Sequence, residues 1–193
     1  KIMKKNAKTG ILLINLGTPD APTKKAVKRY LREFLFDPKV IQLPAIPRWI
    51  LVNLIIAPFR SKKSAHAYQQ IWFNNNKTGS PLKYYTTALT KKMQSSLTAE
   101  QNSHIQIEYA MRYQNPSIFK TLKSFDTKNL DKLIIIPLFP QYSEAATGSA
   151  IDKAKNIIHK HYPELRNKLK IIKDFYNNPD RFAFQTQLFF LLS

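Results

Sequence analysis

The feature that most limits the fold is an apolar run over residues 10–16, GILLINL, which stops at the turn Gly17-Thr-Pro-Asp20. Such a run, followed at once by turn residues, is typical of a strand that is buried on both faces of a sheet. Thr23 is then placed to cap a helix, and apolar residues recur at helical spacing until Asp37-Pro38 ends it. The chain therefore opens with a buried strand followed by a helix.

The same alternation continues along the chain. Further helices are expected over 65–72, 82–97, 117–125 and 145–161, and further strands over 105–111, 133–137 and 169–172. Strands that alternate with helices predict βαβ units, a mainly parallel sheet and right-handed crossovers. Ligands of such sheets bind beyond the carboxyl ends of the strands. The candidate site loops are therefore 16–20, 112–117, 140–149 and 174–179.

An unusual apolar tract, Val40–Phe59, has about the length of a membrane span. It is interrupted by Pro44, Pro47 and Arg48 and is expected to end at Pro58, so a spanning helix is disfavoured. Trp49 beside Arg48 suits a water–lipid interface, and the alternative is a helix buried in the core.

Composition excludes some functions and leaves others open. The chain has no cysteine, which rules out a thiolate metal site built from this chain alone. Its 31 Lys and Arg against 12 Asp and Glu give a net charge of +19, which attracts polyanions without naming one. No nucleic-acid-binding motif supports a nucleic-acid partner. The short apolar stretch after the basic start does not form a signal peptide, and a cytoplasmic location is expected.

The motifs of several common enzymes are missing from the sequence. Only four glycines are present and they are far apart, which disfavours a phosphate loop and a nucleotide cofactor. No hydrolase nucleophile signature is found. His159 and His161 would point about 200° apart on a helix, so they do not form a chelating pair.

Five strand-end and loop segments, taken together, resemble the ferrochelatase family, whose members insert ferrous iron into a porphyrin to make haem. They are LLINLGTPD (12–20), YLREFLFDPKVI (30–41), GSPL (79–82), AMRYQNPSI (110–118) and PLFPQYSEAATGS (137–149). Their order and spacing fit the family over about residues 10–180, and residues 57–72 look most like Gram-negative bacterial members.

This resemblance implies a chelatase-like, Rossmann-like parallel sheet flanked by helices, the first of two similar halves with the porphyrin between them. It divides the chain into a basic tail (1–9), an α/β domain (10–175) with a membrane-facing lip (40–63), and a truncated or altered start of the second half (176–193). Ferrous iron and a porphyrin, either protoporphyrin IX or coproporphyrin, would be substrates, with no cofactor required. An anionic membrane surface is the expected peripheral partner.

Seven positions match porphyrin-pocket positions of the family. They are Leu16, Arg60, Ser80, Arg112, Tyr113, Tyr142 and Ser143. Arg60 falls where an arginine meets porphyrin propionates, and a guanidinium offers paired donors to a carboxylate. Each position has a structural alternative: core packing for Leu16, a turn cap for Ser80, ion pairs for the two arginines, and packing for Tyr142.

The catalytic residues of the family are not matched. A histidine after the next strand and a later glutamate carry the metal insertion in the family, and none of His66, His104, His159 and His161 is at that histidine's position. No catalytic and no metal residue is assigned, and the chain alone is expected to be impaired. The alternative function is a basic α/β binding protein for anionic membrane or nucleic acid.

Overall fold

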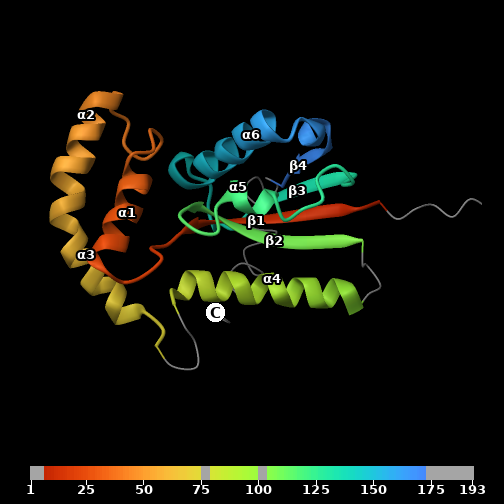
Figure 1. The fold of residues 1–193 in the computed structure, drawn as a ribbon, viewed down its shortest axis with the longest axis horizontal. Coiled ribbons are helices and arrows are strands. Elements are labelled where there is room, and N and C mark those ends of the chain that lie inside the picture. The colour runs from red at the N-terminus through yellow and green to blue at the C-terminus, as the bar shows by residue number, and fades with distance from the viewer. Residues whose placement is uncertain (1–6, 75–78, 100–103, 173–193) are drawn as a thin grey trace, which may run out of the picture.

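The computed structural model describes residues 7–74, 79–99 and 104–172 (Figure 1). Its sheet has four parallel strands in the order β2-β1-β3-β4. The strands are β1 (Thr9–Gly17), β2 (Ile105–Tyr113), β3 (Lys132–Pro137) and β4 (Leu169–Ile171). The predicted parallel α/β sheet and all of its expected strands are confirmed.

Helices cover both faces of this sheet, with α4 (Pro81–Ala99) on one side and α5 (Ile118–Leu122) and α6 (Ser149–His161) on the other (Figure 1). Leu12, Leu13 and Ile14 of β1 are almost completely buried, as expected for a strand packed on both faces. Leu12 and Ile14 belong to the core under α5 and α6, whereas Asn15 Nδ2 donates to Thr86 Oγ1 of α4.

The helix α1 (Lys24–Leu35) follows β1 as predicted, and the Thr23 hydroxyl accepts a hydrogen bond from the Ala26 N–H at its start. It leaves the sheet and packs chiefly against α3 (Ala57–Ile71). Figure 1 shows α1, α3 and α2 (Ala45–Ile50) as a group beside one end of the sheet. This group lies next to the carboxyl ends of the strands, where ligands of parallel sheets bind.

The expectation that Pro58 ends the apolar tract is wrong. A π-helical turn, η1 (Leu51–Ile56), joins α2 to α3, so the helical run continues from Ala45 to Ile71. The Ala57 N–H bonds to the Val52 carbonyl, five residues back. This wider turn displaces the backbone carbonyls with which the Pro58 ring would otherwise clash. The helix therefore continues through Pro58.

The alternative of a helix buried in the core is also wrong for most of this tract. Ile46, Leu54 and Phe59 are 76%, 57% and 78% exposed. Arg48, expected at an interface, instead turns inward, where its guanidinium donates to the Ile41 and Leu43 carbonyls. None of the described helices is both long and apolar enough to cross a membrane.

Smaller differences concern the ends of helices. The helix α5 ends at Leu122 rather than Phe125, and the helix expected from Ala145 begins as a second π-helical turn, η2 (Glu144–Gly148). A 3-10 helix, η3 (Pro163–Lys168), precedes β4. The expected loop 174–179 and the segment 176–193 lie outside the described residues, as do residues 1–6 of the tail.

Candidate functional site

The carboxyl ends of β1, β2 and β3 lie at one edge of the sheet because the strands are parallel. Gly17 is opposite Tyr113 in the register of β1 and β2, and the Leu138 N–H donates to the Ile14 carbonyl where the loop leaves β3. Gly17 has a φ of +110°, a conformation that glycine adopts readily. This edge carries the strand-end residues that the sequence singled out.

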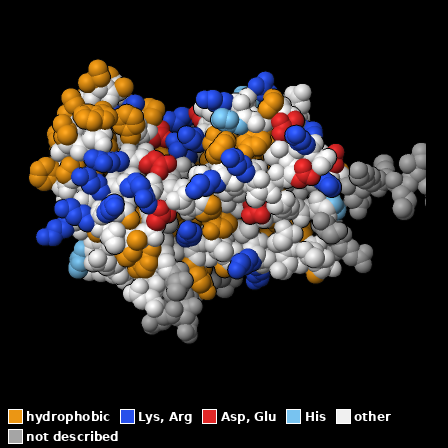
Figure 2. Space-filling view, viewed as in Figure 1, with side chains coloured by type: hydrophobic (Ala, Val, Ile, Leu, Met, Phe, Trp, Pro, Cys, Tyr) orange, Lys and Arg blue, Asp and Glu red, His pale blue; other side chains and the backbone are white. Residues whose placement is uncertain are grey.

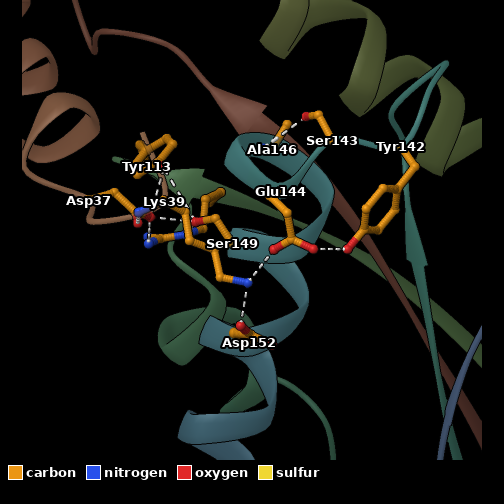
Figure 3. Close-up of polar contacts among 10 residues, drawn as sticks. Asp37, Lys39, Tyr113, Tyr142, Ser143, Glu144, Ala146, Ser149 and Asp152 are labelled. Atoms are coloured by element: carbon orange, nitrogen blue, oxygen red, sulfur yellow. Dashed lines mark hydrogen bonds and ion pairs between the residues drawn. The ribbon is translucent and has the colours of Figure 1, made fainter. Parts of the chain in front are cut away.

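A buried polar cluster around Asp37 connects this edge to the segment after α1 (Figure 3). Asp37 Oδ2 accepts hydrogen bonds from Arg112 Nη2 at 2.5 Å, Ser149 Oγ at 2.5 Å and the Tyr113 hydroxyl at 2.9 Å. The Lys39 N–H donates to Asp37 Oδ1 at 2.8 Å. Arg112 Nε also donates to Ser149 Oγ, and the guanidinium lies 4.4 Å from the Tyr113 ring centre.

These contacts set the charge state of the cluster. Burial alone would raise the pKa of Asp37, but the hydrogen bonds from Ser149, the Lys39 N–H and Tyr113, together with the Arg112 charge, lower it overall. Burial raises the pKa of Tyr113 to about 12. At neutral pH the cluster therefore contains a carboxylate, a guanidinium and a neutral phenol.

A second, more exposed cluster lies beside the first (Figure 3). Lys39 Nζ is 2.6 Å from Asp152 Oδ2 and 2.8 Å from Glu144 Oε2, and the Tyr142 hydroxyl donates to the Glu144 carboxylate. The hydrogen bond to Asp152, followed by the one to Glu144, raises the pKa of Lys39. Residues 37 and 39 thus fix the segment after α1 to β2, to η2 and to α6.

Five of the seven predicted pocket residues lie at this edge. Leu16 is half-buried against the core, Arg112 and Tyr113 belong to the Asp37 cluster, and Tyr142 is 50% exposed. The Ser143 hydroxyl accepts from the Ala146 N–H and caps η2. The ion-pair alternative for Arg112 is therefore observed, whereas contact of these residues with a porphyrin stays a prediction.

The other two predicted residues belong to helices beside this edge, since α4 begins at the end of the sheet where α1 and α3 lie (Figure 1). Ser80 is buried just before α4, and its carbonyl accepts from the Tyr84 N–H. Arg60 is exposed on α3.

The four histidines are not grouped at the candidate site. His104 precedes β2, at the opposite edge of the sheet, and His159 and His161 are in the last turn of α6. His66 is exposed on α3. Within residues 7–74, 79–99 and 104–172, no three His, Cys, Asp or Glu side chains are close enough together to hold a metal ion.

Sequence reasoning missed the residues that build the two clusters, namely Asp37, Lys39, Glu144, Ser149 and Asp152. From the sequence alone, Asp37-Pro38 indicates only the end of a helix. A signal was available for Asp37, because it lies inside the segment YLREFLFDPKVI and is one of only 12 acidic residues in a strongly basic chain.

Comparison with known proteins gives one consistent match. The model of the ferrochelatase family matches residues 8–188. Curated relatives named ferrochelatase include one from Legionella pneumophila, 50% identical over 93% of this chain and 51% of the relative. One from Methylococcus capsulatus is 43% identical over 90% of the chain and 50% of the relative. One from Coxiella burnetii is 47% identical over 80% of the chain and 42% of the relative. The chain spans about half the length of these relatives.

Proposed function

This chain belongs to the ferrochelatase family, and on that premise we propose that it supplies one half of a site that inserts ferrous iron into a porphyrin in haem biosynthesis. The observation that carries the proposal is the gathering of five predicted pocket residues at the carboxyl edge of a parallel sheet. Ferrous iron and protoporphyrin IX or coproporphyrin are the substrates in this proposal, and no cofactor is included.

The contacts of the strand-end residues suggest a separate role for each of them in porphyrin binding. Leu16 offers an apolar side chain to one face of the macrocycle, and Tyr142 and Ser143 line the pocket beside it. Arg112 and Tyr113 form a wall that Asp37 holds in place, since both donate to its carboxylate. Ser80 contributes the turn before α4. A wall held by buried hydrogen bonds keeps its shape when a flat, rigid ligand binds.

Arg60 is the member of the set whose proposed role is easiest to test. Arg60→Ala is expected to weaken binding of a dicarboxylic porphyrin threefold to tenfold. A charge-assisted hydrogen bond contributes about 1.5–3 kcal/mol where water is excluded, and exposure reduces this. Absorbance titration is run with the acid and with its dimethyl ester, and Lys62→Ala, which removes a charge from the same helix, is the control.

The ester is decisive because it keeps the macrocycle and lacks both charges. A propionate contact predicts that Arg60→Ala weakens acid binding and leaves ester binding unchanged. Equal weakening of both ligands would assign Arg60 to the fold, and no change in either would place it outside the pocket.

We expect the chain alone to bind porphyrin without inserting iron faster than the uncatalysed reaction. The resemblance implies that a histidine of the other half accepts pyrrole protons or meets the metal, and that a later glutamate assists it. None of the four histidines here is at that histidine's position in the sequence, and His104, His159 and His161 lie towards the opposite edge of the sheet. Anaerobic insertion is followed by absorbance with the purified chain. Turnover above background would contradict this assignment, and single His→Asn variants would then identify the group responsible.

The proposal also includes a cytoplasmic location with peripheral contact to a membrane. Its support is an apolar ridge on the lip, formed by Ile46, Trp49, Ile50, Leu54 and Phe59, whose side chains are 44–78% exposed. Exposed apolar groups of this size on one helix are typical of interfacial surfaces. The alternative of a basic nucleic-acid-binding protein receives no support from the comparisons.

A further inference from the structure

The strand β2 forms one edge of the described sheet, and α4 runs beside it (Figure 1). A groove of about 720 Å³ lies between them, and its lining includes Gln94 of α4 and Ile107 and Tyr109 of β2. Because β2 has a neighbouring strand on one side only, the backbone N–H and C=O groups of every second residue face away from the sheet. An edge of this kind pairs with a strand of another chain unless its outward groups are occupied.

The Gln94 side chain occupies two of these outward groups. Its Nε2 donates to the Ile105 carbonyl at 3.0 Å, and its Oε1 accepts from the Ile107 N–H at 2.7 Å. In a parallel sheet, the N–H and C=O of one residue bind the same two groups of the strand beside it. The Gln94 amide therefore bonds to β2 in place of a neighbouring strand.

The later part of the edge is occupied in another way. Thr121 Oγ1 donates to the Tyr109 carbonyl at 3.1 Å, and the Met111 N–H donates to the Pro116 carbonyl at 2.7 Å. In the part of the chain that the structure describes, the Ile107 carbonyl and the Tyr109 N–H make no hydrogen bond. These two groups are the open part of the edge between the Ile105 carbonyl and the Met111 N–H.

The open groups and the groups held by Gln94 form a self-complementary set. Two β2 edges paired antiparallel and centred on Ile107 would make four hydrogen bonds. The Ile107 N–H would donate to the Ile107 carbonyl of the second copy, and the Tyr109 N–H to its Ile105 carbonyl, each twice by symmetry. Every one of these bonds uses a group that Gln94 holds, so none of them forms while Gln94 stays in place.

The side chains are compatible with this pairing. In the same register, Gln106 of one copy is opposite Glu108 of the other, so no like charges meet. The sequence of β2, IQIEYAMRY, contains isoleucine and tyrosine, which favour strands.

The surface around the edge offers little other support for self-association. Among the described residues with large exposed apolar side chains, only Leu82 belongs to α4 and none belongs to β2. Figure 2 shows hydrophobic side chains gathered over α2 and only scattered over α4 and β2. On this side of the molecule, pairing therefore depends on the backbone of β2.

We propose that Gln94 closes the β2 edge against pairing, and that the partner it excludes is the β2 edge of a second copy of this chain. The chain is then monomeric through this surface because one amide side chain holds the two groups that every pairing bond needs. The inference does not depend on porphyrin binding or iron insertion.

Gln94→Met tests the inference because it keeps the length of the side chain and removes the amide. Its self-association, measured by sedimentation velocity, should have a dissociation constant at least about tenfold below that of the wild type, since four backbone hydrogen bonds become available. Gln70→Met makes the same change at an exposed position of α3 and is the matched control. It should associate no more than the wild type.

Gln106 identifies the register of the pairing. Added to Gln94→Met, Gln106→Lys puts opposite charges across the pair at two equivalent positions, and Gln106→Glu puts like charges there. The first change should tighten the dimer about twofold to thirtyfold and the second should weaken it by a similar factor. In the wild-type background, neither change should cause association.

Hydrogen exchange at the Ile107 N–H reports the state of the edge. Exchange should be slow in the wild type, fast in dilute Gln94→Met, and slow again in concentrated Gln94→Met, where the edges pair. The Tyr109 N–H should exchange faster than the Ile107 N–H in the wild type.

Four results would overturn the inference. A Gln94→Met chain that stays monomeric would have an open edge that does not pair. Equal association of Gln70→Met would assign the effect to added apolar surface, and equal dissociation constants for the two Gln106 changes would exclude this register. Fast exchange of the Ile107 N–H in the wild type would show that Gln94 does not hold the edge. Circular dichroism verifies folding, and the wild-type exchange measurement decides the question even if Gln94→Met does not fold.

Discussion

Gly17→Ala is expected to destabilise the protein by about 3–5 kcal/mol, whereas Gly79→Ala should cost about 1–2 kcal/mol. Both glycines have a positive φ, +110° at Gly17 and +94° at Gly79, so both changes carry the same kind of backbone cost. They differ in the space around the added Cβ. A Cβ at Gly17 would lie 2.0 Å from the Tyr113 carbonyl oxygen, while at Gly79 no atom of the described residues is within 4 Å.

The clash at Gly17 cannot be relieved by a side-chain rotation. The added Cβ would clash with a backbone atom of β2, and Gly17 and Tyr113 are paired in the register of β1 and β2. Moving Tyr113 would also move its hydroxyl away from Asp37. The substitution would therefore distort the carboxyl ends of β1 and β2, where the proposed pocket residues Leu16 and Arg112 lie.

Denaturant unfolding of the two variants measures the difference. Gly79→Ala serves as the control because it isolates the backbone cost, and the excess at Gly17 measures the close approach of the strands. Similar destabilisation by both changes would show that the two strand ends separate at little cost. The edge would then be too compliant to hold a rigid pocket wall.

The sheet was predictable from the sequence because its signals are local. The GILLINL run, the Thr23 cap and the alternation of strands with helices each depend on neighbouring residues, and each is confirmed. The parallel-sheet rule then placed Leu16, Arg112, Tyr113, Tyr142 and Ser143 at one edge. Arg60 and Ser80 came from the resemblance alone, and they belong to α3 and to the turn before α4, beside that edge.

The lip and the Asp37 cluster were not predictable because they depend on tertiary structure. A proline normally ends a helix, and no residue near Pro58 in the sequence indicates the π-helical turn that allows the helix to continue. Asp37 follows a helix and precedes a proline, and the same pattern is found where a helix ends at the protein surface. Its partners Arg112 and Ser149 are 75 and 112 residues away, so only the folded chain shows that they meet.

Asp37→Asn is expected to lower the free energy of unfolding by about 3–5 kcal/mol, the cost of leaving one member of a buried ion pair without its partner. Asp37 is 7% exposed, and the Arg112 side chain is 12% exposed. The asparagine keeps the size of the side chain but loses the negative charge. Its amide nitrogen also cannot accept the hydrogen bonds that Ser149 and Tyr113 donate to the carboxylate.

Asp152→Asn is the matched control, since it makes the same chemical change in an ion pair at the surface. Asp152 pairs with Lys39, and its side chain is 52% exposed. Exposed pairs contribute about 0–1 kcal/mol, so this variant should be nearly as stable as the wild type. Adding Arg112→Met to Asp37→Asn should recover part of the loss, because no buried charge is then left unpaired.

The pH dependence of unfolding separates the Asp37 charge from the shape of the side chain. The folded-state pKa of Asp37 is lowered, so its ionised form contributes stability above the unfolded pKa of about 3.9, and this contribution is lost as the pH falls through the folded pKa. The gap between wild type and Asp37→Asn should therefore be constant near neutral pH and shrink below about pH 4. A gap that stays the same at acidic pH would mean that the asparagine disturbs packing. The carboxylate would then not be what holds Arg112 and Tyr113 at the strand end.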